Sequence, residues 1–147
     1  MKLSLFSDYS LRVLIYASLR EGRFQLKDVS QAYGISRNHL AQVVHRLGHG
    51  GSPDNPIGRG GGCRLARPAG EVRIGRLFQQ TEDQPAIMEC FDQKTNTCRM
   101  AGNCRIQSAL AQAMAAFYSS LDQYTLADVV TGAHGEVISR ILMSVPS

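Results

Sequence analysis

The chain has 147 residues, 44% of them hydrophobic, which is enough to bury an ordinary core without disulfide staples. The apolar stretch at residues 1–7 is too short for a signal peptide, and no stretch approaches the roughly 18 apolar residues of a membrane span, so we expect a soluble, cytoplasmic protein. Residues 1–75 carry 11 Lys and Arg against 5 Asp and Glu, whereas residues 76–147 carry 5 against 7. This imbalance favours a first half that meets a polyanion, with an ordinary basic surface as the alternative.

The first predicted element is an amphipathic helix. Ser7 is placed as its N-cap, and Gly22 ends it. Apolar residues recur between these two positions at helical spacing, at Leu11, Leu14, Ile15 and Leu19.

The following residues predict two short helices joined by a tight turn. Leu26 and Val29 mark the first helix, Gly34 can supply a left-handed turn, and Ser36 caps the second. The second helix has an inward stripe formed by Leu40, Val43, Val44 and Leu47. Two such helices with a Gly-containing turn indicate a helix-turn-helix, whose second helix enters the major groove of DNA.

The sequence GRGGGCRLAR (residues 58–67) predicts the tip and the returning strand of a basic hairpin, with Arg59 at the apex. In that strand Cys63 and Leu65 alternate with Arg64 and Ala66. A basic hairpin directly after a helix-turn-helix is the wing of a winged helix, although a flexible glycine loop is also compatible with the glycines. The preceding GSPDNPI contains two prolines, which cannot donate ladder hydrogen bonds, so the wing is either half-built or relies on its second strand.

Polar residues at the start of the second helix and on the wing are the predicted DNA contacts. Arg can pair with guanine and Asn or Gln with adenine, while a helix N-terminus favours phosphate. The same residue types are also typical of a plain solvated face. The predicted DNA-binding residues are Lys27, Ser36, Arg37, Asn38, His39, Gln42, Arg59 and Arg64.

The second half predicts a short helix, an irregular segment and a long helix. The short helix begins near Ile74, and residues 81–103 lack sustained periodicity. From Cys104 onward, the spacing predicts a helix of about twenty residues with a coiled-coil-like seam. The seam consists of Ile106, Leu110, Met114, Phe117, Leu121 and Tyr124. We expect a second copy of the chain to cover it, the alternative being that the helix packs only on its own chain.

Three of the four cysteines, Cys90, Cys98 and Cys104, lie in the irregular segment. A reducing cytosol argues against disulfides, and the usual C-x-x-C zinc pair is missing. Gaps of seven and five residues favour an iron–sulfur cluster with one iron site left for a ligand from elsewhere, while zinc, thiol redox chemistry and inert thiols remain alternatives. Cys63 is expected to be an apolar filler. We do not expect an enzyme, because the four histidines lie outside this segment and offer no evident base for a thiol.

Together these patterns predict a mainly α fold in three parts. Residues 1–80 form a winged helix-turn-helix DNA-binding domain with a small β wing. Residues 81–104 form a cysteine loop that binds the cluster. Residues 105–147 form a long dimerisation helix and a C-terminal tail.

Five stretches are recognisable: FSDYSLRVLIY, ISRNHLAQVVHRL, GRGGGCRLARP, the three-cysteine loop and YTLADVV. Together they resemble the Rrf-two-type winged-helix regulators over about residues 1–130, and most closely the nitric-oxide-sensing repressors of that family. The chain departs from the family pattern at GSPDNPI, where a hydrophobic strand is usual, and at Cys63, where a plain aliphatic is usual.

The resemblance implies a homodimer that binds double-stranded operator DNA and carries an iron–sulfur cluster, either [2Fe-2S] or [4Fe-4S]. The cluster would be held by Cys90, Cys98 and Cys104, with Asp8 of the partner subunit as the remaining ligand. Asp8 has a plainer role too, since a carboxylate in a first helical turn favours the helix dipole. The implied function is repression of nitrosative-stress defence genes, relieved by nitric oxide. The alternative is a related regulator that reports iron–sulfur supply or redox state.

Overall fold

The computed structural model describes residues 2–49, 57–58, 62–82 and 87–144 of the chain. Helices make up most of this part, and the named strands form one two-stranded antiparallel sheet. In chain order the elements are α1 (Leu5–Leu19), α2 (Leu26–Tyr33), α3 (Arg37–His49), β1 (Ile57–Gly58), β2 (Arg64–Leu65), the 3-10 turn η1 (Ala69–Glu71), α4 (Ile74–Thr81), the 3-10 turn η2 (Glu89–Phe91), α5 (Arg105–Leu121), α6 (Leu126–Val130) and α7 (Gly132–Met143). The predicted mainly α fold with a small β wing is confirmed.

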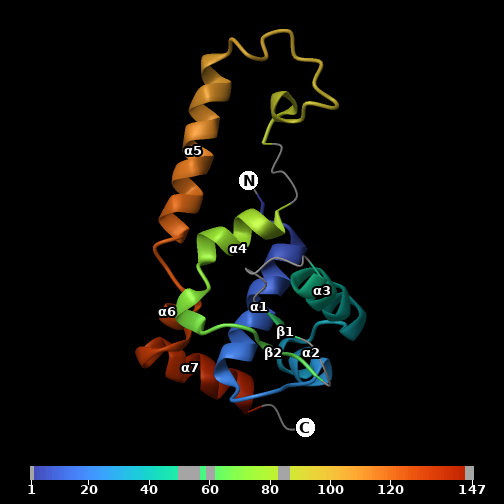
Figure 1. Cartoon of the computed structure of the whole chain (residues 1–147), viewed down its shortest axis with the longest axis vertical. Helices are drawn as coiled ribbons and strands as arrows, with labels where there is room; N and C mark the ends of the chain where they lie inside the picture. The colour runs from blue at the N-terminus through green and yellow to red at the C-terminus, as the bar shows by residue number, and fades with distance from the viewer. Residues whose placement is uncertain (1, 50–56, 59–61, 83–86, 145–147) are drawn as a thin grey trace.

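Most elements gather around α1, while α5 and the cysteine-bearing segment before it extend away from this body (Figure 1). α1 contacts α3, α4 and α6, and Val13 and Leu14 on it are fully buried. Its N-cap is Ser4, whose hydroxyl oxygen accepts a hydrogen bond from the backbone N of Ser7 at 3.1 Å. The prediction of Ser7 as the cap is therefore wrong, because Ser7 lies inside the first turn with its side chain buried.

α2 and α3 form the predicted helix-turn-helix. Gly34 ends α2 with φ +66°, and its N–H donates to the carbonyl of Ser30 at 2.8 Å. Glycine adopts this left-handed conformation without steric cost, which explains its place in the turn. The carbonyl of Ser36 accepts from the N–H of Leu40, so α3 begins directly after Ser36. All four residues of the predicted inward stripe are buried: Leu40, Val43, Val44 and Leu47.

The wing is a short sheet in which Ile57 lies opposite Leu65 and Gly58 opposite Arg64. Cys63, just before β2, exchanges two backbone hydrogen bonds of 2.8 and 2.9 Å with Phe24, which lies between α1 and α2. These bonds tie the returning strand to the helical body. Residues 51–56 and the predicted apex, Arg59, lie outside the described residues.

α4 begins at Ile74, as predicted, and packs closely against α5. A Cβ atom at Gly75 would collide with the backbone oxygen of Tyr118 and with Asp122. The carboxylate of Asp122 accepts from the backbone N of Arg76 at 2.9 Å, so the residue that follows α5 satisfies an N–H in the first turn of α4. The two helices are therefore joined both by close backbone contact and by a hydrogen bond.

The predicted seam of α5 divides into two regions. Met114, Phe117 and Leu121 pack against the core of the same chain, whereas Ile106 near the other end is 61% exposed. The helix ends at Leu121, so Tyr124 lies beyond it and is 57% exposed. Packing on its own chain therefore accounts for the inner part of the seam alone.

Two helices after α5 were not predicted from the sequence pattern. α6 starts with a capping box, in which the Asp128 carboxylate accepts from the backbone N of Thr125 at 2.7 Å and the Thr125 hydroxyl accepts from the N–H of Asp128. Leu126 is fully buried, and α6 packs on α1, while α7 lies near α2. The helices in the described part of the chain are all too short or too polar to cross a membrane.

The approach of α4 to α5 can be tested at Gly75. We expect Gly75→Ala to lower the free energy of unfolding by about 1–3 kcal/mol, because the added methyl group forces the two helices apart. Urea unfolding followed by circular dichroism measures the change. Gly70→Ala is the matched control, since Gly70 is exposed and a Cβ there meets nothing within 4 Å. Equal unfolding midpoints for the two variants would contradict the close approach.

Candidate DNA-reading face and cysteine loop

The described residues predicted to contact DNA are exposed on α2, on the first turns of α3 and on β2. The exposed members are Lys27, Ser36, Arg37, Asn38, His39, Gln42 and Arg64. Arg59, the remaining member, lies outside the described residues. The exposed set combines helix-start polar groups with cations, which is the arrangement that a recognition helix presents to a duplex.

An open groove of about 720 Å³ brings part of this set together. Lys27 on α2 and Arg37 and Asn38 on α3 line one part of it, and Cys63 at the base of the wing lines another. Gln25 also lines this groove, and the sequence pattern did not single it out as a contact. Its polar side chain at the N-cap position of α2 was the available signal. The other exposed candidates lie outside the lining of the groove.

Asp8 lies in the first turn of α1 and forms an ion pair with Arg12, with 3.0 Å between Oδ1 and Nε. This hydrogen bond raises the pKa of the Arg12 guanidinium, although partial burial acts against it. The guanidinium carbon lies 5.7 Å from the ring centroid of Tyr33 on α2, and burial raises the pKa of the Tyr33 hydroxyl to about 12. The ring of Tyr9, next to Asp8, lies 6.3 Å from that of His39 on α3. The Asp8 side chain is thus linked through Arg12 to α2, and its neighbour in sequence, Tyr9, lies beside α3.

A chain of hydroxyl groups joins the first turn of α1 to the end of α4. The Ser4 hydroxyl donates to that of Ser7 at 3.3 Å, the oxygens of Ser7 and Thr81 are 2.7 Å apart, and Thr81 donates to the carbonyl of Leu77 at 2.9 Å. The backbone N of Ser4 also donates to the carboxylate of Glu82 at 2.7 Å. The segment that carries the cysteines therefore leaves the body at a point bonded to the helix that carries Asp8.

The three clustered cysteines are free thiols and each is half-buried. Among the residues that the structure describes, no group of three His, Cys, Asp or Glu side chains could hold a metal ion. The single chain therefore does not bring Cys90, Cys98, Cys104 and Asp8 into one ligand set, and their assignment as ligands stays a prediction. Cys63 is 8% exposed and belongs to the hydrophobic core, as expected for an apolar filler.

Hydrogen bonds connect the three cysteine-bearing stretches to one another. The Glu89 carboxylate accepts from both the backbone N and the hydroxyl of Thr97, at 2.9 and 2.7 Å. The bonds from Thr97 lower the pKa of Glu89. The Gln107 side chain donates to the carbonyl of Cys90 at 2.9 Å and accepts from the N–H of Gly102 at 3.0 Å. These residues were not singled out from the sequence, because their partners are eight, seventeen and five positions away.

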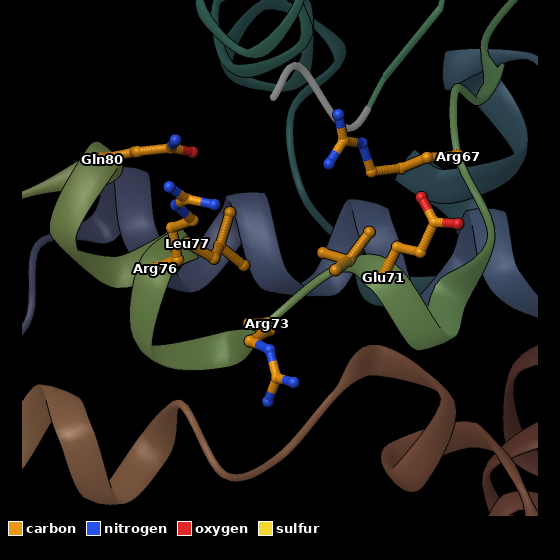
Figure 2. A pocket seen from close by; sticks show the side chains of 7 residues that line it. Arg67, Glu71, Arg73, Arg76, Leu77 and Gln80 are labelled. Carbon is orange, nitrogen blue, oxygen red and sulfur yellow. The ribbon is translucent and has the colours of Figure 1, made fainter. Parts of the chain in front are cut away.

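A small pocket of about 80 Å³ lies between η1 and α4 (Figure 2). Arg67, Glu71 and Arg76 are among its lining residues, so both signs of charge meet there. Figure 2 shows Arg73 directed toward the segment after α5, where it donates to the carbonyl of Asp122 at 2.8 Å. The small volume and mixed charge fit a packing gap between two elements.

A helix-turn-helix with an exposed polar recognition helix, followed by a two-stranded wing, defines the class of winged-helix DNA-binding proteins. The chain belongs to the Rrf2 family, whose model is described as an iron-dependent transcriptional regulator and matches residues 3–132. The protein is thus a DNA-binding transcriptional regulator.

Curated relatives and solved structures agree with this family. The chain is 42% identical to the HTH-type transcriptional regulator NsrR of Shouchella clausii over 88% of its length and 89% of that protein. It is also 42% identical to NsrR of Bacillus subtilis, over 88% and 90% of the two chains. The structure of CymR, the global cysteine regulator of B. subtilis, has the same fold, with a TM-score of 0.66 at 19% identity over 88% and 95% of the chains. The oxidised form of Staphylococcus aureus CymR gives a TM-score of 0.61 at 26% identity over 86% and 93%.

Proposed function

We propose that the protein is a homodimeric repressor of nitrosative-stress defence genes, whose binding to operator DNA is controlled by nitric oxide through an iron–sulfur cluster. The observation that carries the proposal is the set of three free, half-buried thiols on one hydrogen-bonded loop in a member of a family described as iron-dependent. The relatives named NsrR, which match most of the chain, support the repressor assignment.

The cluster would be held by Cys90, Cys98 and Cys104, with Asp8 of the partner subunit as the remaining ligand. These side chains fit an iron–sulfur cluster, because cysteine thiolates are its usual ligands. Within the described residues, none of the three thiols forms a disulfide. When bound, the cluster would supply iron with which nitric oxide reacts. In the described part of a single chain the three thiols do not themselves form a ligand set, so under this proposal they come together when the cluster binds.

A second copy of the chain is the partner that best fits the exposed apolar residues around the loop and α5. Met88 and Met100 in the cysteine-bearing segment are 47% and 65% exposed, and Ile106 on α5 is similarly exposed. A helix face of this kind gains stability when it is buried against another apolar face. Dimerisation also gives two reading heads, which multiplies specificity for a two-part operator.

The surroundings of Asp8 offer a route from the cluster site to DNA. An Asp8 that serves the partner's site gives up its pair with Arg12, whose guanidinium lies over Tyr33 of α2. The neighbouring Tyr9 contacts His39 at the start of the recognition helix. In this proposal, a change in Asp8 would reach α2 through Arg12 and Tyr33. A coupling of about 1–3 kcal/mol would change DNA affinity roughly 5- to 150-fold.

Replacement of one loop cysteine tests the proposal. We expect anaerobically purified wild-type protein to be coloured, to contain iron, and to release operator DNA when nitric oxide is added. Cys98→Ala should lose the iron and the response together, because one of three thiolate ligands is removed. Absorption spectra, iron content and a gel-shift titration measure these properties. Ser108→Ala, an exposed change on α5 close to Cys104 in sequence, is the control and should keep both; a Cys98→Ala variant that keeps its iron and still releases DNA on nitric oxide would overturn the assignment.

Substitutions at the start of α3 test the DNA-reading face. We expect Arg37→Ala and Asn38→Ala each to weaken binding by about 1–3 kcal/mol, because each removes hydrogen bonds to a base edge or a phosphate. Fluorescence anisotropy with a duplex selected by the wild-type protein from a random library measures the loss. Arg140→Ala, an exposed change on α7, should bind as the wild type does. Equal affinities for all four proteins would exclude the start of α3 as the DNA-binding surface.

The second candidate function is a related regulator that reports iron supply or redox state, which the description of the family as iron-dependent favours. The DNA-reading face would be the same in both cases. Comparison of DNA release by nitric oxide, by oxygen and by an iron chelator separates the two. Release by the chelator or oxygen at concentrations where nitric oxide has no effect would favour this second candidate.

A further inference from the structure

We infer that Glu89, Thr97 and Gln107, here called the loop clasp, are positioning residues that keep the three cysteine-bearing stretches near one another, so that the cofactor can gather their thiols. The inference rests on the proposed function, since it assigns the clasp a role toward the iron–sulfur cluster. It concerns residues that are not themselves proposed as ligands. They act on the cluster site through the backbone on which the cysteines stand.

The first half of the clasp joins the stretches that carry Cys90 and Cys98. Glu89 and Thr97 each immediately precede one of these cysteines, and a single carboxylate oxygen of Glu89 accepts both the N–H and the hydroxyl of Thr97. Without such a link, the eight-residue step between the two cysteines could extend to about 26 Å. The two hydrogen bonds therefore restrict the separation of two thiols that the sequence alone leaves free.

The second half of the clasp brings Cys104 into the same framework. Gln107 lies in the first turn of α5, three residues after Cys104. Its side-chain amide donates a hydrogen bond to the Cys90 carbonyl and accepts one from the Gly102 N–H. Gly102 has φ +87°, so the chain turns there in a conformation that glycine tolerates. One side chain thus fixes the beginning of the loop, the turn before Cys104 and the start of α5 relative to one another.

The placement of these bonds indicates that they restrain the conformation of the cysteine loop and contribute little to the stability of the fold. Glu89 and Thr97 are exposed, and neither they nor Gln107 belong to the hydrophobic core. A loop that is already restrained loses less conformational entropy when a ligand is bound, which raises affinity. Groups that orient metal ligands in this indirect way commonly change affinity about 10- to 100-fold when removed.

A double-mutant cycle on the anaerobically purified homodimer tests the first half. We expect Glu89→Ala to speed iron release to a ferrous chelator about tenfold, because it removes both hydrogen bonds from Thr97. Thr97→Val should have a smaller effect, because it removes the hydroxyl bond and leaves the backbone N–H bonded to Glu89. The double variant should be no faster than Glu89→Ala alone, since no bond between the two residues is left for the second change to remove. Glu89→Gln keeps the accepting oxygen and should restore the wild-type rate and the visible circular dichroism of the cluster. Gln93→Ala, an exposed change in the same segment, is the matched control.

Gln107→Ala tests the second half, with the exposed Gln112→Ala on the same helix as its control. We expect faster iron release and, in iron-free protein, faster hydrogen exchange at the Gly102 amide, with an unchanged unfolding midpoint. If the wild-type protein contains iron but releases it at the same rate as every variant, the role of the clasp is contradicted and the proposed function still stands. A wild-type protein that is free of iron when prepared without air overturns the proposed function, and the cofactor-positioning role with it.

Discussion

The buried hydroxyl contact between Ser7 and Thr81, which are 74 positions apart in sequence, joins the first turn of α1 to the last turn of α4. A buried hydroxyl left without a partner costs about 1–3 kcal/mol, so the first turn of α1 and the last turn of α4 are held in one register. Thr81 donates onward to a carbonyl of its own helix, which leaves Ser7 as the donor in the contact. The contact thereby joins α1, which packs on the recognition helix α3, to α4, which leads into the cysteine segment.

Elements with local sequence signals were predictable, whereas features that depend on contacts between distant residues were not. The helix-turn-helix rests on local signals, namely the left-handed turn at Gly34 and the buried stripe of α3, and these are written in adjacent residues. The N-cap of α1 was placed three residues too late, because Ser7 has the right residue type for a cap but finds its partner far along the chain. α6 was missed because five residues carry too little periodicity. Its capping box at Thr125 and the burial of Leu126 against α1 supply the stability that propensity does not.

The candidate site was predictable in its residue types and not in its assembly. Residue type and position marked the exposed cations and amides of the reading face, since solvent-facing polar groups on a recognition helix need no distant partner. The cysteines could be located, but no local rule says which stretches of an irregular loop approach each other. Glu89 and Gln107 set that approach through bonds across the loop. In the described part of the chain the three thiols do not form a ligand set, so the sequence located the cysteines without predicting how they come together.

The loop is connected to the reading head through α4 at both of its ends. At its beginning, it follows Thr81, which is bonded to α1. At its end, it continues into α5, a helix of 17 residues and about 25 Å, whose far end meets α4 at Gly75. Because α4 packs on α1, and α1 packs on α3, a shift at either end of the loop acts on the same packed pair of helices before it reaches DNA. Close-packed helices move as units and do not deform smoothly, so under the proposed function a small rearrangement among the thiols would be transmitted to the recognition helix through this packing.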